Sequence, residues 1–410
     1  PQRFRSVATR SLALNLQVGM LQRNASKGVS SRLKGATNGK TSTLFFRYFY
    51  FFSFDWRCAR VQRQFYCCTG WALQMAKHLK KPKTMKHIHT SYLGLQLTSP
   101  IVVASSPFTA DIEGVRAAAE AGAGAVVLKS IFEEQIIGQS DHLSEFATSP
   151  FGDTDDYLQH YVGEDYRGRF LQLVTDAKAQ TSIPIIASIN CIGAGARWVD
   201  YANELGTAGA DALEINLFTL ATDRHTRSER IEEDYQYVVR RVCSAVKIPV
   251  SVKLPLRLTA PINVVDRMWG VGARGVVLYN RPFEPDVDIE TLRFKPSNPY
   301  SEVVELRNSL RWIALCTRVM PQIDVAVSTG VHSGAEAVKA LLCGARIVQV
   351  CTAIQRGGYG AISEMNRAIE AWGREHGFRT IEEFRGRVAE PADSDDLLLR
   401  TQYMRYFPKG

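Results

Sequence analysis

From Tyr92 onward the chain alternates short apolar runs, many of them β-branched, with longer amphipathic or alanine-rich segments. Most of the apolar runs are continuous, which is typical of parallel strands buried on both faces, and the segments between them have a helical pattern. The pattern predicts eight strands, at Ile101–Ala104, Ala125–Leu128, Ile185–Ile189, Ala212–Ile215, Val250–Leu254, Val276–Tyr279, Val325–Val327 and Ile347–Val350.

A related pattern occurs four times and ends each time in one of these predicted strands. The copies are AGAGAVVL (121–128), AGADALEI (208–215), VGARGVVL (271–278) and CGARIVQV (343–350). Each copy places a glycine where a helix would end, and glycine tolerates the left-handed conformation that closes a helix before the chain turns into a sheet. Eight strands separated by helices favour an α/β fold of the (β/α)8 TIM-barrel type, and a doubly wound open sheet is the alternative.

The positive charge of the chain is concentrated at its beginning. Residues 1–86 hold 17 Lys and Arg and one acid, which gives 17 − 1 = +16. The other residues hold 50 − 17 = 33 basic and 41 − 1 = 40 acidic side chains, which gives −7. The basic character therefore belongs to the first segment alone, and we expect no nucleic-acid partner for the remainder.

These patterns divide the chain into a basic, irregular leader (1–85), a barrel (86–390) and a C-terminal tail (391–410). The leader contains the aromatic run TLFFRYFYFFSF (43–54), which is interrupted by Arg47 and is shorter than the roughly 20 residues that a membrane-spanning helix needs. We therefore expect no membrane span. The leader is an organelle-targeting segment, an interfacial membrane anchor, or a non-native extension that precedes a true start at Met85.

The eight cysteines are scattered, without a CxxC pair or a Cys/His cluster. This spacing predicts no metal site, neither zinc nor iron–sulfur. The adjacent Cys67 and Cys68 also make a poor disulfide framework, so we expect a reducing, cytoplasmic location.

In a (β/α)8 barrel the functional face lies at the carboxyl ends of the strands. The residues that follow the predicted strands are mostly polar: Ser105, Ser106, Lys129, Ser130, Asn190, Asn216, Lys253, Asn280, Arg281, Ser328, Thr329, Gly330, Cys351 and Thr352. One lysine beyond a strand is usually a solvated rim residue, but here two lysines and three asparagines recur at equivalent places. No carboxylate pair and no Ser/His/Asp group occurs among them, so the set favours binding of an anion and of a flat, amide-containing small molecule over hydrolysis.

The last two strand ends, VSTGVHSG (327–334) and VCTAI (350–354), have the composition of a phosphate site. Small residues let backbone N–H groups approach a phosphate, and the loops after the last two strands are its usual position in this fold. The alternative is that these are tight turns that need small residues.

The motifs along the barrel resemble those of one known family. They are PIVVASSP (100–107), VVLKS (126–130), EIN (214–216), VKLP (252–255), STGV (328–331), LLCGARIVQVCTAI (341–354) and FRTIEEFRG (378–386). From about Thr90 to Gly386 the chain resembles the dihydroorotate dehydrogenase family, specifically its class 1-like branch. The resemblance implies an FMN-dependent (β/α)8 flavoprotein of pyrimidine biosynthesis, and we expect a homodimer.

The resemblance also implies roles for the strand-end residues. Contact with FMN is implied for Ser105, Ser106, Lys129, Ser130, Asn190, Asn216, Lys253, Ser328, Thr329, Gly330, Cys351 and Thr352. Substrate binding is implied for Lys129, Asn216 and Asn280. The catalytic role of Lys253 would be to stabilise the negative charge that hydride transfer leaves around flavin N1 and O2.

The chain departs from the family where the proton chemistry should occur. Thr219 stands where relatives have a cysteine or serine base, and a threonine hydroxyl is a far weaker base that needs a relay such as an ordered water. The alternative is a threonine that only caps a turn. Ala221 stands where the class 1 pattern has an asparagine. His225 and His332 follow these loops and are further candidates for a general acid or base.

The loop after the second strand also differs from the family. The Asn-, Gly- and Pro-rich substrate segment is absent between Ile131 and Tyr166, where nine acidic residues occur instead. This stretch is a lid or a solvated loop, and an acidic lid would not favour the anionic orotate.

Together these features predict an oxidoreductase that oxidises dihydroorotate, or a related cyclic amide, by hydride transfer to FMN. One alternative is a cofactor-free barrel enzyme that uses Lys253 or Lys129 as a Schiff-base nucleophile on a phosphorylated ligand. Another is a flavin-binding paralogue without dihydroorotate activity.

Overall fold

The computed structural model describes Met85 and residues 87–132, 166–191, 197–390 and 397–402. The described residues all belong to one unit, Lys80–Gly410. The three interpretations of the leader concern residues outside the described ones and stay predictions. Within the described ranges, no helix is long and apolar enough to cross a membrane.

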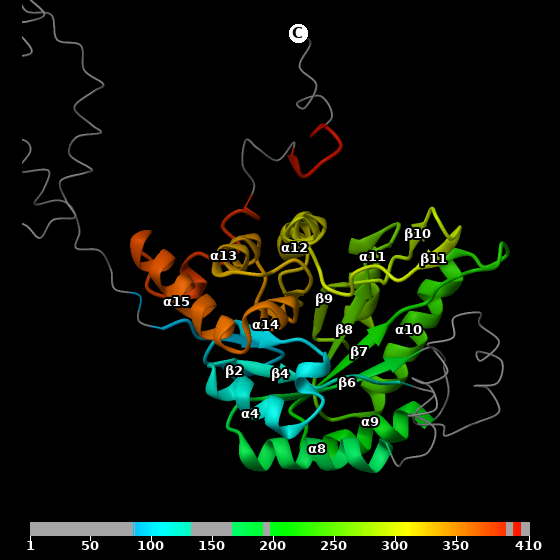
Figure 1. Cartoon of the computed structure of the whole chain (residues 1–410), viewed down its shortest axis with the longest axis horizontal. Coiled ribbons are helices and arrows are strands. Elements are labelled where there is room, and N and C mark those ends of the chain that lie inside the picture. The colour runs from blue at the N-terminus through cyan, green and yellow to red at the C-terminus, as the bar shows by residue number, and fades with distance from the viewer. Residues whose placement is uncertain (1–84, 86, 133–165, 192–196, 391–396, 403–410) are drawn as a thin grey trace, which may run out of the picture. The chain divides into compact units, whose positions relative to one another are not determined.

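Eight parallel strands form a closed barrel with helices around it (Figure 1). They are β3 (Ile101–Val103), β4 (Ala125–Val127), β6 (Ile185–Cys191), β7 (Ala212–Leu217), β8 (Val250–Pro255), β9 (Gly275–Asn280), β12 (Asp324–Val327) and β13 (Ile347–Val350). Pairing of β4 with β6 closes the ring, which excludes the open sheet. The predicted (β/α)8 barrel is confirmed, and every predicted strand agrees with the structure to within two residues at its ends.

The helices occupy the segments between the strands, as the pattern predicts. They are α4 (Ile112–Glu120), α8 (Tyr166–Gln180), α9 (Arg197–Thr207), α10 (Ser228–Ala245), α11 (Pro261–Gly270), α12 (Arg307–Val319), α13 (Gly334–Cys343), α14 (Thr352–Gly357) and α15 (Gly360–Glu375). The glycine in each of the four repeats has a positive φ: Gly122, Gly209, Gly272 and Gly344. This confirms that the repeat marks the end of a helix before a strand.

A short hairpin fills the amino-terminal end of the barrel. Its strands, β1 (Thr90–Tyr92) and β2 (Leu95–Leu97), pair antiparallel, and its apolar side chains pack among the inward-facing residues of the barrel strands. The Leu93 amide donates to Asp324 at the start of β12, 2.7 Å away. A Cβ on Gly275 would lie 2.7 Å from the Leu93 side chain, so the first residue of β9 has to be small. We call β1 and β2 the floor hairpin.

Smaller elements extend from the barrel. They are β5 (Ile131–Phe132), which pairs with β6; the hairpin of β10 (Asp286–Asp288) and β11 (Arg293–Lys295); and the short 3₁₀ helices η2 (Pro107–Thr109), η3 (Val303–Leu306) and η4 (Ile381–Glu383). In the tail, Arg311 of α12 donates to the Leu397 carbonyl and to Gln402. The described part of the tail is thus bound to α12.

Gly344 and Gly377 provide a test of these helix ends, because both have positive φ but differ in their surroundings. A Cβ on Gly344 would lie 2.2 Å from Thr317 Oγ1, whereas nothing lies within 4 Å of a Cβ on Gly377. Gly377→Ala should cost about 1–2 kcal/mol from backbone strain. Gly344→Ala should cost roughly 2–5 kcal/mol, because overpacking adds to the strain. Urea denaturation followed by circular dichroism would measure both. Equal losses of stability would show that Thr317 does not crowd a side chain at position 344.

Candidate functional site

The carboxyl ends of the strands bring the predicted polar residues together. The strand register places Asn190 beside Asn216 and Asn216 beside Lys253 on three successive strands. The predicted site residues that are buried are Ser106, Lys253, Ser328, Gly330 and Thr352. Those that are half-buried are Ser105, Lys129, Ser130, Asn190, Asn216, Asn280, Thr329 and Cys351. These residues therefore line one end of the barrel, and Thr219 is the predicted site residue that is exposed.

Three hydroxyl groups are linked where β3, β4 and β6 end. The Ser105 and Ser130 hydroxyls lie 3.0 Å apart, and the Ser130 and Ser188 hydroxyls lie 2.7 Å apart. The Ser130 amide also donates to the Ser105 hydroxyl, at 2.8 Å. A serine hydroxyl can donate or accept, so this hydroxyl chain can bind either a hydrogen-bond donor or an acceptor of a ligand.

A carboxylate, an amide and an ammonium group form a second network inside the barrel. Lys253 Nζ donates to Gln349 Oε1 at 3.1 Å, and Gln349 Nε2 donates to Glu214 Oε2. The ammonium also lies 3.9 Å from Glu214 Oε1. Both charged side chains are buried, and Glu214 is 0% exposed. We call Glu214, Gln349 and Lys253 the charged layer.

Burial determines the protonation behaviour of this layer. It raises the pKa of Glu214 above its ordinary value of 4.5, while the Lys253 charge and the Gln349 hydrogen bond act in the opposite direction. Burial and then the Glu214 charge raise the pKa of Tyr92, in the floor hairpin, well above its usual value. The Glu214 carboxyl group thus lies between a cation at the site and a neutral phenol below it.

The strand-end pattern missed four inward-facing polar residues: Ser188, Glu214, Ser251 and Gln349. Each precedes a predicted site residue by two positions, and residues two apart in a strand point to the same side. The sequence held this signal as S-x-N, E-x-N, S-x-K and Q-x-C at the ends of β6, β7, β8 and β13. A polar residue at such spacing in a strand that is buried on both faces indicates a polar layer inside the barrel.

The predicted phosphate loops lie side by side and are joined by a residue that the sequence analysis did not identify. The Ser301 hydroxyl accepts from the Gly330 amide at 3.2 Å and lies 3.1 Å from the Thr352 hydroxyl. Thr329 and Gly330 both have left-handed φ, of 77° and 78°. A Cβ on Gly330 would lie 2.4 Å from the Leu306 nitrogen, so the chain passes too close there for any larger residue.

Basic side chains border these loops. His332 Nε2 lies 3.0 Å from the Ser301 hydroxyl, and its Nδ1 lies 3.1 Å from Arg356. Burial, and then the Arg356 charge, lower the pKa of His332, so a nearby anion would be needed to keep its ring protonated. At the start of α14, burial raises the pKa of the Cys351 thiol, an effect opposed by Ser106 and Lys253. This end of the site is suited to a phosphate.

Thr219 stands at the edge of this arrangement. Its amide donates to the hydroxyl of Tyr235, on α10, at 3.0 Å. Burial raises the pKa of that phenol, and Thr219 acts in the opposite direction. The sequence analysis missed Tyr235, whose position in an amphipathic helix gave no functional signal. His225 is exposed and interacts with Arg224 and Asp223.

Asn216 has a side-chain oxygen that can accept a hydrogen bond from a ligand. Its Oδ1 is buried and has no hydrogen-bond partner among the described residues. A buried amide oxygen without a partner costs free energy, and a ligand N–H group would satisfy it. A heterocyclic imide such as the flavin ring system carries such a group, so the donor set fits FMN.

The acidic stretch 133–165 lies outside the described residues, so its interpretation as a lid stays a prediction.

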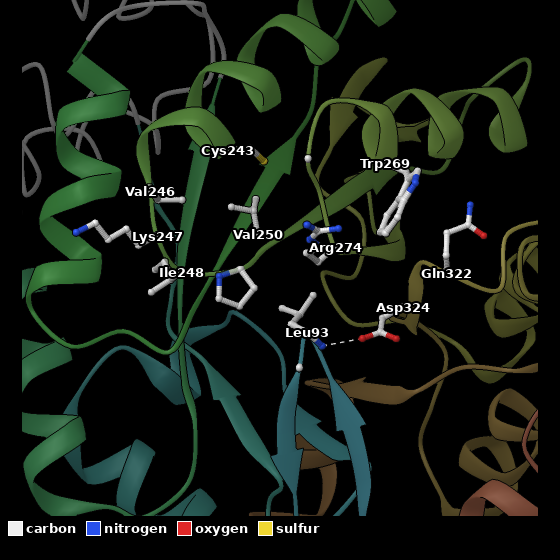
Figure 2. A pocket seen from close by; sticks show the side chains of 13 residues that line it. Leu93, Cys243, Val246, Lys247, Ile248, Val250, Trp269, Arg274, Gln322 and Asp324 are labelled. Atoms are coloured by element: carbon white, nitrogen blue, oxygen red, sulfur yellow. Dashed lines mark hydrogen bonds between the residues drawn. The ribbon is translucent and has the colours of Figure 1, made fainter.

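A separate pocket of about 600 Å³ lies at the opposite, amino-terminal end of the barrel (Figure 2). It is lined by residues of the floor hairpin and by the loops that lead into β8, β9 and β12, including Leu93, Trp269, Arg274 and Asp324. The Arg274 guanidinium lies over the Trp269 ring, 5.1 Å from its centroid. No predicted site residue lines this pocket, so it is distinct from the polar strand ends.

The comparisons with known proteins agree with this geometry. The model of the dihydroorotate dehydrogenase family matches residues 87–372. The chain is 28% identical over 317 residues to the catalytic subunit of dihydroorotate dehydrogenase B (NAD(+)) from Thermococcus kodakarensis, which covers 75% of this chain and 100% of that protein. It is 24% identical over 330 residues to the chloroplastic dihydropyrimidine dehydrogenase (NADP(+)) of Arabidopsis thaliana, covering 72% and 75% of the two chains. It is also 23% identical over 321 residues to subunit PreA of the NAD-dependent dihydropyrimidine dehydrogenase of Escherichia coli, covering 73% and 76%.

The raised pKa of Glu214 predicts a pH-dependent effect of Glu214→Gln on stability. A carboxyl group whose pKa is higher in the folded state contributes stability below its unfolded pKa and loses it as pH rises through the folded value. From pH 4.5 upward, wild type should therefore lose stability relative to the variant, by up to about 1.4 kcal/mol per pH unit. Urea titrations across this range would measure the difference.

Glu336→Gln is the matched control, because Glu336 is a buried carboxyl group outside the charged layer. Burial alone would raise its pKa, but hydrogen bonds from Ser333 and Lys339 lower it on balance. As pH falls below 4.5, wild type should therefore lose stability relative to Glu336→Gln, which is the opposite direction to that expected for Glu214→Gln. A Glu214→Gln difference that stays constant with pH would contradict the assignment.

Proposed function

Because the chain belongs to the dihydroorotate dehydrogenase family, we propose that it is an FMN-dependent oxidoreductase that oxidises dihydroorotate or a related cyclic amide. The observation that carries this proposal is the buried Lys253 ammonium beside Asn216, at the carboxyl end of the barrel, with phosphate-type loops on the last two strands. When bound, FMN supplies a two-electron acceptor for a hydride.

The residues that would hold the cofactor fall into two groups. Ser328, Thr329, Gly330, Cys351 and Thr352 would hold the phosphate, because they lie at the ends of β12 and β13, where this fold usually binds one. The polar edge of the ring system would contact the remaining set, which is Ser105, Ser106, Lys129, Ser130, Asn190, Asn216 and Lys253. The buried amide oxygen of Asn216 suits the imide N–H of that edge.

Lys253 would supply the electrostatic stabilisation. Lys253 is 6% exposed and its ammonium group is held by Gln349, so it is fixed before any reaction begins. A fixed charge in a water-poor environment stabilises developing negative charge more strongly than water does, because no solvent has to reorganise. The ammonium is held by Gln349 and lies 3.9 Å from Glu214, an arrangement that disfavours the cofactor-free alternative in which Lys253 is a Schiff-base nucleophile.

Thr219 would take part in proton removal from the substrate carbon. Its exposed position at the end of β7 allows it to meet a substrate that enters from the carboxyl end of the barrel. The Tyr235 phenol holds the Thr219 backbone and thereby fixes the loop. A threonine hydroxyl is too weak a base to act alone, so we propose that it orients a water that carries the proton away.

A dihydropyrimidine is a second candidate substrate. Among the similar proteins described above, those from Arabidopsis thaliana and Escherichia coli are named for dihydropyrimidine dehydrogenase, and the one from Thermococcus kodakarensis is named for dihydroorotate. Both substrates are cyclic amides, which Lys129, Asn216 and Asn280 would bind through the same ring edge. They differ in the carboxylate, which dihydroorotate carries and an unsubstituted dihydropyrimidine lacks.

Lys253→Met tests the proposed cofactor. The full-length protein should bind FMN, and the variant should bind it with a lower reduction potential, because the reduced, negatively charged form loses its stabilising cation. Each tenfold loss in relative affinity for the reduced form corresponds to about 30 mV for a two-electron couple, and we expect at least one such step. Equilibrium titration against redox dyes would measure it. Lys178→Met is the control, because Lys178 is on the outer helix α8 and pairs with Asp211. A protein that stays colourless after incubation with FMN would contradict the cofactor assignment.

Turnover with a dye acceptor tests the substrate and Thr219 together. Wild type should oxidise dihydroorotate or dihydrouracil. Thr219→Ser should stay active, and Thr219→Ala should lose on the order of 10²-fold or more in kcat while still binding FMN. Thr219→Ala activity equal to wild type would show that this residue only forms the turn. Bound FMN without turnover of either compound would point to another cyclic amide.

A further inference from the structure

Glu214 is a buried charged group for which the proposed reaction has no use. It lies one inward-facing position below Asn216 on β7, and its side chain is about 1% exposed. An ionised carboxylate in such a place is costly unless hydrogen bonds and an opposite charge satisfy it. Its position next to the catalytic lysine therefore calls for an explanation.

The geometry connects Glu214 to Lys253 in two ways. The direct contact is the 3.9 Å ion pair with Nζ. The indirect contact runs through Gln349, whose amide nitrogen donates to Glu214 and whose amide oxygen accepts from Lys253. A reversed Gln349 amide would place a donor against the ammonium and an acceptor against the carboxylate, so the two charges fix its orientation. The amide in turn fixes the direction of the ammonium.

Among the described residues, the neighbours that the strand register and the floor hairpin place beside Glu214 are uncharged at neutral pH. Ser251 of β8 and Ser188 of β6 lie beside Glu214 in the strand register, and Tyr92 of the floor hairpin faces it from below. Burial raises the pKa of the Cys351 thiol, and the Lys253 charge acts on this thiol in the opposite direction. Glu214 is therefore the carboxylate that compensates Lys253 within the described part of the barrel.

We propose that Glu214 is a positioning residue that supplies the counter-charge of Lys253 and, through Gln349, directs its ammonium group at the ligand-binding end of the barrel. This inference deepens the proposed function and rests on it only for the identity of the ligand that Lys253 faces. A buried lysine without a counter-charge tends to lose its proton, because burial penalises the charged form. Without Glu214, the cation on which the proposed stabilisation depends would exist over a narrower pH range.

The test is a titration of Lys253 itself in the full chain, before FMN is added. Protein labelled with ¹³C at lysine Cε gives one signal per lysine by NMR, and the Lys253 signal is the one that Lys253→Met removes. Glu214→Gln should lower the pKa of Lys253 by about one unit or more, because it removes the counter-charge at nearly constant volume. Glu336→Gln, which removes a buried carboxylate elsewhere, should leave Lys253 unchanged. A Lys253 titration that is the same in Glu214→Gln and wild type would overturn the proposal.

Gln349→Met tests the positioning part separately. It retains the Glu214 charge, so the pKa of Lys253 should fall less than in Glu214→Gln. The two Cε protons of Lys253, inequivalent while the ammonium is held, should become equivalent once the side chain rotates. Protons that stay inequivalent in this variant would show that Gln349 does not direct the lysine.

If Glu214→Gln does not fold, the titration of Lys253 in the wild-type protein tests the proposal. The Lys253 signal should move in two steps, once as Lys253 itself titrates and once as Glu214 titrates, above pH 4.5. A single step would overturn the coupling. Absence of FMN binding would contradict the proposed function but would leave this titration readable, so the two failures can be told apart.

Discussion

The structure depends on one constraint, which is that a closed barrel of parallel strands turns every second side chain toward a narrow, water-poor interior. At the amino-terminal end the floor hairpin meets this constraint with apolar packing. Toward the carboxyl end the inward residues are polar, and they must satisfy one another because water is scarce. The hydroxyl chain and the charged layer are the result. The chemistry of the site therefore starts inside the barrel, one layer below the residues that meet a ligand.

The barrel could be predicted from the sequence because its signals are local. Continuous apolar runs gave the strands, and glycines such as Gly344 marked the helix ends, since each depends on a few neighbouring residues. The strand-end residues could be predicted for the same reason. Ser301 could not, because it reaches Gly330 and Thr352 from a distant segment and no local pattern records such a contact. Glu214 and Gln349 had a local signal in their alternation, but their pairing joins β7 and β13, which are far apart in the chain.

The family relationship and the departures from it fall on different parts of the site. The layer around Asn216 and Lys253 keeps the residues that the resemblance implies, and its geometry supports a flavin-type ligand. The departures, Thr219 and Ala221, lie beyond the end of β7, where a substrate would meet the proton-handling group. The residues that would handle the substrate proton thus differ from the family pattern, while those that would hold the cofactor are retained, as expected when function is located in loops on a common fold.

The floor hairpin has a consequence for the order of events at the site. Because apolar side chains fill the barrel interior from the amino-terminal end, a ligand reaches Lys253 from the carboxyl end, and the interior is a well that is closed below. When an interior is open only at one end, the molecule that binds deepest must bind first and dissociate last. A cofactor seated on the charged layer would be retained for as long as a second molecule lies above it. The protein would then exchange substrate and product many times for each cofactor that it loads.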